Sequence, residues 1–101
     1  MNTFAFLYTY DPNNPAIAEI RPRHRDFCSK LKEDGVVVGT GPFTDGDGGA
    51  LLVVRLPEPS TLADAVAIMD RDPFYAEGAL TGRTAHTWNP VINIFSDARS
   101  L

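Results

Sequence analysis

Two titratable residues in separate segments of the chain have types suited to acid/base chemistry. His24 follows the run Arg21-Pro22-Arg23, and Asp72 stands directly before Pro73. Histidine gains and loses a proton near neutral pH more readily than other side chains. A carboxylate beside it orients the ring and stabilises its charged form. We therefore predict that folding brings His24 and Asp72 together as an acid/base pair.

Each member of this pair also has a purely structural interpretation. His24 shares one face of an expected helix with three apolar residues, Phe27, Cys28 and Leu31. It could therefore be a partly buried histidine that bonds to the backbone. Asp72 before a proline has the form of a helix N-cap. A cap uses one carboxylate oxygen and leaves the other free for an imidazole, so Asp72 can fill both roles.

Metal and phosphate sites are not predicted. Cys28 is the only cysteine, which excludes a cluster of cysteine ligands, and we interpret it as a small core residue. His86 has no second histidine at ligand spacing, and we interpret it as packed or on the surface. The glycine-rich loop over residues 41–49 lacks the late Glu of a calcium loop and the Gly-Lys-Ser/Thr of a phosphate loop. We expect no metal and no cofactor.

The hydrophobic pattern predicts an α+β fold with the element order β-α-β-β-α-β. The expected strands cover residues 4–10, 36–40, 51–56 and 83–89, with a possible extra strand at 91–95 after Pro90. A short helical piece to Ile20 is expected to break at Pro22, where a longer helix begins and runs to about Asp34, with Gly35 at the position past its end. A second helix is expected after Thr61, whose spacing to Asp64 is that of a capping box. This order is typical of a ferredoxin-like fold, with two helices on one face of an antiparallel sheet.

The first strand is apolar on both faces, which predicts a homodimer. Phe4, Phe6, Tyr8 and Tyr10 alternate with Ala5, Leu7 and Thr9. Whichever set faces the helices, the other leaves apolar surface on the open side of the sheet. We expect a second copy to cover this face, with the segment 91–95 pairing at the partner's sheet edge.

Charge and composition exclude several partners. The formal net charge is −4, and the longest basic cluster is Arg21, Arg23 and Arg25, which we interpret as solvated charge. Nucleic acid is therefore not an expected partner. The apolar run near Met1 is too short for a signal peptide or a membrane span. Together with the single cysteine, this predicts a soluble protein in the cytoplasm.

The motifs and their spacing resemble the YciI-like (YCII-related) family over nearly the whole chain. The residues that carry the resemblance are Arg21-Pro22-Arg23-His24, Gly35, Gly41-Pro42, Asp72-Pro73-Phe74, Gly78 and Trp88. The resemblance implies one ferredoxin-like domain over residues 1–95, a tail over 96–101, and dimerisation through the sheets, as in the dimeric α+β barrel superfamily. It also implies that His24 and Asp72 form the catalytic dyad. The family is similar to muconolactone isomerases.

These observations lead to one main functional hypothesis and two alternatives. The main hypothesis is a small enzyme that catalyses proton transfer, as isomerisation or elimination, on a muconolactone-like small organic molecule. Aromatic side chains expected to line its substrate pocket are Tyr8, Tyr10, Phe43 and Trp88. The first alternative is a non-catalytic small-molecule-binding or accessory module with a structural dyad. The second, a monooxygenase without cofactor, shares the fold superfamily, but no residue here points to it.

Overall fold

The computed structural model describes residues 1–94, so the predicted tail over 96–101 lies outside the described residues. The elements in chain order are β1 (Asn2–Thr9), α1 (Pro15–Glu33), β2 (Val37–Pro42), β3 (Gly49–Leu56), α2 (Leu62–Met69), α3 (Pro73–Ala76) and β4 (Gly82–Trp88). No helix in this part of the chain is long and apolar enough to cross a membrane.

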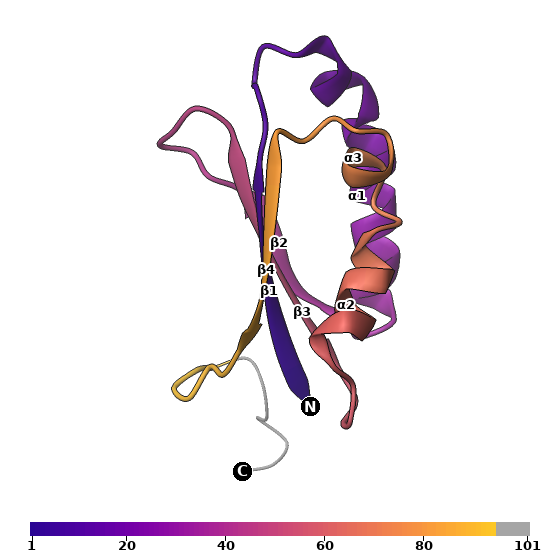
Figure 1. The fold of residues 1–101 in the computed structure, drawn as a ribbon, viewed down its shortest axis with the longest axis vertical. Helices are drawn as coiled ribbons and strands as arrows, with labels where there is room; N and C mark the ends of the chain where they lie inside the picture. The colour runs from indigo at the N-terminus through magenta and orange to yellow at the C-terminus, as the bar shows by residue number, and fades with distance from the viewer. Residues whose placement is uncertain (95–101) are drawn as a thin grey trace.

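The four strands form one antiparallel sheet in the order β2-β3-β1-β4. In the register of the sheet, Phe6 of the central strand β1 lies opposite Leu52 of β3 and Ala85 of β4. All three helices cover the same face of the sheet, and the opposite face carries no helix (Figure 1). The predicted ferredoxin-like α+β fold is therefore confirmed.

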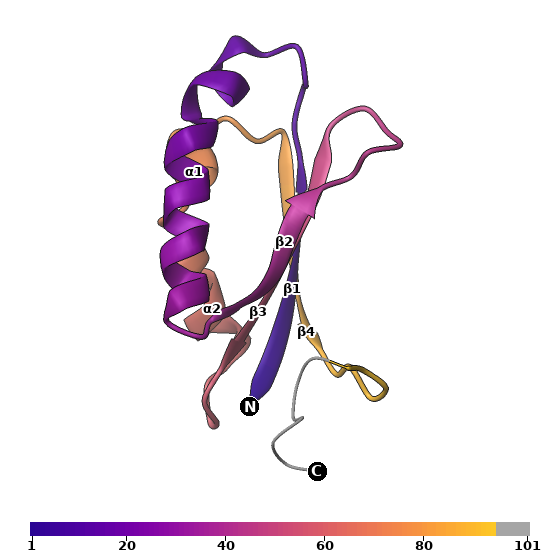
Figure 2. The same cartoon turned by 180° about the vertical axis from the view of Figure 1, so that it is seen from behind.

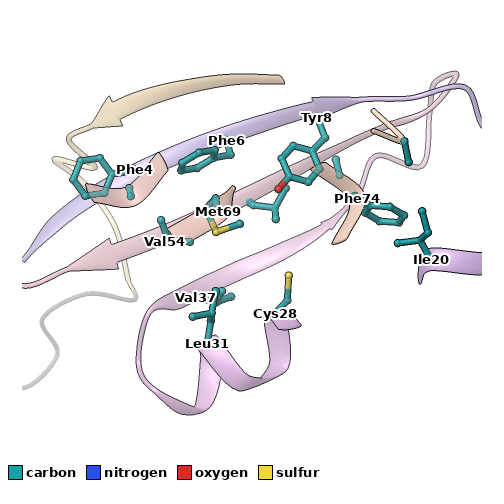
Figure 3. Packing of buried hydrophobic residues seen from close by; sticks show 14 of the residues in the cluster. Phe4, Phe6, Tyr8, Ile20, Cys28, Leu31, Val37, Val54, Met69 and Phe74 are labelled. Atoms are coloured by element: carbon teal, nitrogen blue, oxygen red, sulfur yellow. The ribbon is translucent and has the colours of Figure 1, made fainter. Parts of the chain in front are cut away.

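The core lies between the helices and the covered face of the sheet. The alternation of β1 turns Phe4, Phe6 and Tyr8 toward the helices, where all three side chains are buried. Figure 3 shows these rings packed with Met69 of α2 and Phe74 of α3. The larger aromatic set thus faces the helices, because only that face can bury whole rings within one chain.

Helix α1 is continuous through Pro22, which corrects the expected break at this residue. The ring removes the backbone hydrogen bond that would run to the carbonyl of Ala18. Both residues are exposed, so water can replace the lost donor. Ile17 and Ile20 before the proline and Leu31 after it are buried on the same core, so packing holds the two halves in one helix.

The residues after β4 differ from the prediction of an extra strand. Residues 91–94 form bends and irregular structure, and Phe95 lies outside the described residues. Pro90 has no N–H group to donate to a ladder, and the sheet formed by residues 1–94 has no strand beside this segment. The side chains of Val91, Ile92 and Ile94 are 79%, 95% and 97% exposed.

The open face of the sheet carries apolar side chains. Leu7 and Leu51 lie opposite each other in the β1–β3 ladder, and each is 37% exposed. Trp88, at the end of β4, is exposed on the same face. The single chain therefore leaves an apolar strip on the side of the sheet that the helices do not cover.

Candidate active site

The structure places the side chains of His24 and Asp72 in direct contact. Nδ1 of His24 lies 2.8 Å from Oδ1 and 2.9 Å from Oδ2 of Asp72. His24 projects from the middle of α1, and Asp72 stands at the start of α3. The His24 side chain is 13% exposed and that of Asp72 is 0% exposed. The carboxylate therefore lies behind the imidazole, and only the imidazole reaches solvent.

Local sequence explains why Asp72 sits where it does. Asp72 is the N-cap of α3, and its Oδ1 accepts a 3.1 Å hydrogen bond from the backbone N–H of Phe74. Pro73 follows at the first helical position, where a missing N–H costs nothing. The predicted capping role is confirmed, and the cap leaves Oδ2 available to other donors.

Tyr8 provides a further hydrogen bond to this carboxylate. Its hydroxyl donates to Oδ2 of Asp72 at 2.8 Å. Burial raises the pKa of Tyr8 well above its usual value, and the negative charge of Asp72 raises it further. Tyr8 therefore keeps its proton and remains a donor. The Tyr8 hydroxyl and the Phe74 backbone N–H thus both donate to this buried side chain, which offsets part of the cost of removing a carboxylate from water.

Two neighbours hold the imidazole ring of His24 in place. The ring of Phe74 packs against it with centroids 4.3 Å apart. Sγ of Cys28, one turn later on α1, lies 3.9 Å from both ring nitrogens. Burial, helped by the charge of Asp72, raises the pKa of Cys28 to about 12, so the thiol is protonated at neutral pH. Cys28 is buried, as predicted for a core residue.

His24, Cys28 and Asp72 are also the described residues that could hold a metal ion, since one ligand atom of each lies within 4.8 Å of the others. The surroundings of these three side chains are less suited to binding a metal ion than to a hydrogen bond between His24 and Asp72. A thiol must lose its proton to bind a metal, and burial opposes this in Cys28. Both oxygens of Asp72 already accept hydrogen bonds from protein donors. The arrangement therefore fits a hydrogen-bonded acid/base pair better than a ligand set.

A cavity of about 500 Å³ opens beside His24, between α1 and the edge strand β2. Figure 2 shows this side of the molecule, with α1 and β2 nearest the viewer. The cavity is lined by His24, Cys28 and Phe74, and β2 contributes apolar surface through Val37 and Val38. The cavity is large enough for a small organic molecule. Such a molecule would meet the imidazole and not the carboxylate.

Comparison with known proteins agrees with the fold and the motifs. The sequence model of the YCII-related domain matches residues 2–89. The chain belongs to the YCII-related family. No curated protein sequence matches it.

Solved structures show the same fold at low sequence identity. The 5-chloro-2-hydroxyhydroquinone dehydrochlorinase of Burkholderia phenoliruptrix, solved with 2,5-dihydroxybenzoquinone, superposes with a TM-score of 0.72 and 14% identity, covering 86% of this chain and 93% of that chain. An antibiotic biosynthesis monooxygenase gives a TM-score of 0.57 at 14% identity, covering 88% and 97%. A protein from Agrobacterium tumefaciens gives 0.56 at 15% identity, covering 89% and 93%.

The structure separates the four aromatic residues expected to line the pocket of this YCII-related protein. Tyr10 lines the cavity beside His24, with its ring stacked on Phe74 at a centroid distance of 6.2 Å. Tyr8 is buried behind the dyad and contacts Asp72. Phe43 and Trp88 instead line a second hollow, of about 520 Å³, together with Leu51 and Val53 of the open sheet face. Within one chain, Phe43 and Trp88 are therefore not brought to the His24 cavity.

One ion pair outside the dyad joins the helices to the sheet. Asp70, the C-cap of α2, forms a 2.8 Å ion pair with Arg83 of β4. The Arg83 guanidinium also lies 3.6 Å from the centre of the Tyr75 ring. These contacts tie the segment that carries Asp72 to the sheet. No local signal predicts them, because the partners come from different elements.

The arginines of α1, interpreted mostly as solvated charge, are exposed or half-buried, and two of them also lie at the cavity. Arg21 and Arg25 line the His24 cavity together with Lys32, which sequence analysis did not single out. Steps of four and seven residues place the side chains of Arg21, Arg25 and Lys32 on one helical face. The four-residue and seven-residue spacings were the signal in the sequence that could have identified them.

Proposed function

We propose that this YCII-related protein is an enzyme that transfers a proton on a small organic molecule, with His24 as the catalytic acid/base and Asp72 as its orienting partner. The observation that carries the proposal is the placement of His24. Its ring bonds to a fully buried carboxylate on one side and lines an open cavity of about 500 Å³ on the other. An imidazole held in this way suits general acid/base catalysis.

The two nitrogens of the ring take different roles in this proposal. Nδ1 carries its proton toward Asp72, which leaves the lone pair on Nε2 to accept a proton from the substrate. The charged imidazolium is stabilised by the carboxylate. In an isomerisation the proton returns to another atom of the substrate. In an elimination a leaving group departs with its electron pair, and the imidazolium releases its proton to solvent or to that group.

The reaction of one structural neighbour supports the elimination form. A dehydrochlorinase removes hydrogen and chlorine from its substrate, and the similar fold of that protein can house such a reaction. Muconolactone-like lactones and chlorinated hydroquinones are therefore the substrates to test first. At 14% identity the likeness concerns the fold, and the roles proposed for His24 and Asp72 rest on their own contact and on the cavity beside His24.

The test compares the wild type with His24→Ala in two assays. The first follows exchange of carbon-bound hydrogen for deuterium in heavy water by NMR, and the second follows chloride release. We expect His24→Ala to lower the rate by about 10²–10⁴-fold. The matched control is Ser29→Ala, which changes a different polar residue of the same cavity wall. Equal rates for wild type and His24→Ala would remove His24 from any catalytic role.

The alternative is a non-catalytic binding module in which the dyad is structural. The capping of α3 by Asp72 favours this alternative, since the cap alone gives the carboxylate a function. It predicts that His24→Ala and Asp72→Asn lower the melting temperature but leave stabilisation by a bound ligand unchanged.

We further propose that two copies assemble through their open sheet faces. The exposed Leu7 and Leu51, and the strongly exposed Val91, Ile92 and Ile94, support this arrangement. In the assembly the segment after Pro90 would gain a partner strand, which it does not have among the described residues of one chain. Phe43 and Trp88 would then lie at the interface, where a partner copy could bring them near a bound molecule.

A further inference from the structure

The His24 cavity has a charge opposite to that of the whole chain. The formal net charge of the protein is −4, yet the residues that line this cavity include Arg21, Arg25 and Lys32 and no Asp or Glu. All three cationic side chains come from α1, where their spacing puts them on one face. The dyad carboxylate lies behind His24 and is fully buried. A molecule in the cavity therefore meets positive charge at its edge.

These three cations have no carboxylate partner within residues 1–94. Arg23, on a different face of α1, forms an ion pair with Glu77, and Arg83 pairs with Asp70. No such ion pair joins Arg21, Arg25 or Lys32 to a described acidic residue. Their charge is thus available to a ligand and is not neutralised by the fold.

The cavity also offers apolar surface close to these cations. Val37, Val38 and Phe74 line it, and Tyr10 adds an aromatic ring. A guanidinium presents two parallel N–H groups that match the oxygens of a carboxylate, whereas a lysine contributes a point charge. The cavity therefore combines a cationic edge that can bind an anion with an apolar wall on which the hydrophobic part of the same ligand can pack.

We propose that the cavity selects small organic carboxylates, with the carboxylate drawn to the cationic edge that Arg21, Arg25 and Lys32 form and the carbon body directed toward His24. This inference deepens the proposed function, on which it rests for the identity of the site. The charge selection itself does not require that His24 perform catalysis.

The experiment uses two probes of the same shape and different charge. Benzoate is an anion at neutral pH, and benzamide is its neutral counterpart. Titration of the full-length protein, followed by amide shifts in NMR spectra, gives the dissociation constant of each probe. We expect benzoate to bind about tenfold more tightly than benzamide at low salt. Added salt is expected to reduce this preference, because the cations are close to solvent.

The double variant Arg21→Gln/Arg25→Gln is expected to bring the affinity for benzoate close to that for benzamide. Glutamine keeps a similar helix propensity, so α1 should form as before. Lys30→Gln is the matched control, since Lys30 is an exposed cation of the same helix that does not line the cavity. It removes the same kind of charge and should leave the preference for benzoate intact.

Two outcomes would overturn the inference. One is benzoate binding no more tightly than benzamide, which includes no detectable binding of either probe at about 20 mM. The other is an unchanged preference in the double variant. His24→Ala separates the two proposals: it should keep the benzoate preference if charge selection is right, whatever its effect on proton transfer.

Discussion

The hydroxyl of Tyr8 donates a 2.8 Å hydrogen bond to Oδ2 of Asp72, so the central strand of the sheet holds the carboxylate that faces His24. Tyr8 and Asp72 are both fully buried. The hydrogen bond links β1 to the start of α3 and fixes Asp72 from the side opposite the cavity. Tyr8 is thus a positioning residue in the proposed mechanism.

Tyr8→Phe removes this hydrogen bond with little change in packing. A hydrogen bond to a buried charge contributes about 1.5–3 kcal/mol, and we expect the free energy of unfolding to fall by this amount. The midpoint of urea unfolding measures the change. Tyr10→Phe is the control, because the Tyr10 hydroxyl has only a 3.5 Å contact with the carbonyl of Gly49. If both variants lost the same free energy of unfolding, the hydrogen bond from Tyr8 to Asp72 would contribute no more to stability than the contact of Tyr10.

Two substitutions of Asp72 separate its capping role from its charge. Asparagine caps helices about as well as aspartate, so Asp72→Asn keeps the cap but loses the charge that faces His24. Asp72→Ala loses both, and we expect its free energy of unfolding to lie about 1 kcal/mol below that of Asp72→Asn. Both variants should lose proton-transfer activity. Full activity in Asp72→Asn would contradict the orienting role proposed for the carboxylate.

The thiol of Cys28 should react slowly with iodoacetamide in the folded protein. Its pKa is raised to about 12, whereas an ordinary cysteine titrates near 8.5. Because the thiolate is the reactive form, about one thiol in a thousand is reactive at pH 9, against more than half in an unfolded chain. Mass spectrometry of alkylated protein should show a rate that rises about tenfold per pH unit up to pH 11. A plateau near pH 9 would contradict the raised pKa.

Sedimentation should detect a particle of about twice the 11.0 kDa chain mass. Leu51→Lys places a charge in the apolar strip of the open sheet face and is expected to shift the equilibrium toward monomer. Ala67→Lys adds the same charge to the exposed surface of α2 and should leave the assembly unchanged. A wild-type particle of one chain mass at low micromolar concentration would refute the dimer proposal.

Gly48→Ala is expected to destabilise the end of the β2–β3 hairpin loop. Gly48 has a φ of +99°, and an added Cβ would meet the carbonyl oxygen of Tyr10. Strain of this kind costs about 1–3 kcal/mol, and the clash adds to it. Gly46→Ala in the same loop has open space and no positive φ, so its melting temperature should match the wild type. Equal melting temperatures for the two variants would contradict the close approach at Gly48.

Features that depend on neighbours in the chain could be predicted from the sequence. The capping box of Thr61 and Asp64, the N-cap of α3 at Asp72 and the end of α1 before Gly35 all appear in the structure. Each depends on hydrogen bonds or backbone angles within a few residues. The strands were predicted to within two residues at their ends for the same reason, since alternation is a local pattern.

Pro22 and the segment after Pro90 show where local rules failed. Each proline removes one backbone donor, but the result depends on what surrounds it. At Pro22, buried residues on both sides keep α1 continuous. Beyond Pro90, none of the four described strands lies in position to pair, and residues 91–94 do not extend the sheet. Packing decided both cases, and packing is not a local property.

The sequence by itself determined the types of residue available for chemistry and the order of elements that carry them. Only the tertiary structure decided which of them meet. His24 and Asp72 are 48 positions apart, and their contact depends on α1 and α3 packing on the same face of the sheet. The same packing placed Arg21 and Arg25 at the cavity and left Phe43 and Trp88 on the opposite face. Contacts between distant segments follow from how whole faces bury apolar area, which no short stretch of sequence specifies.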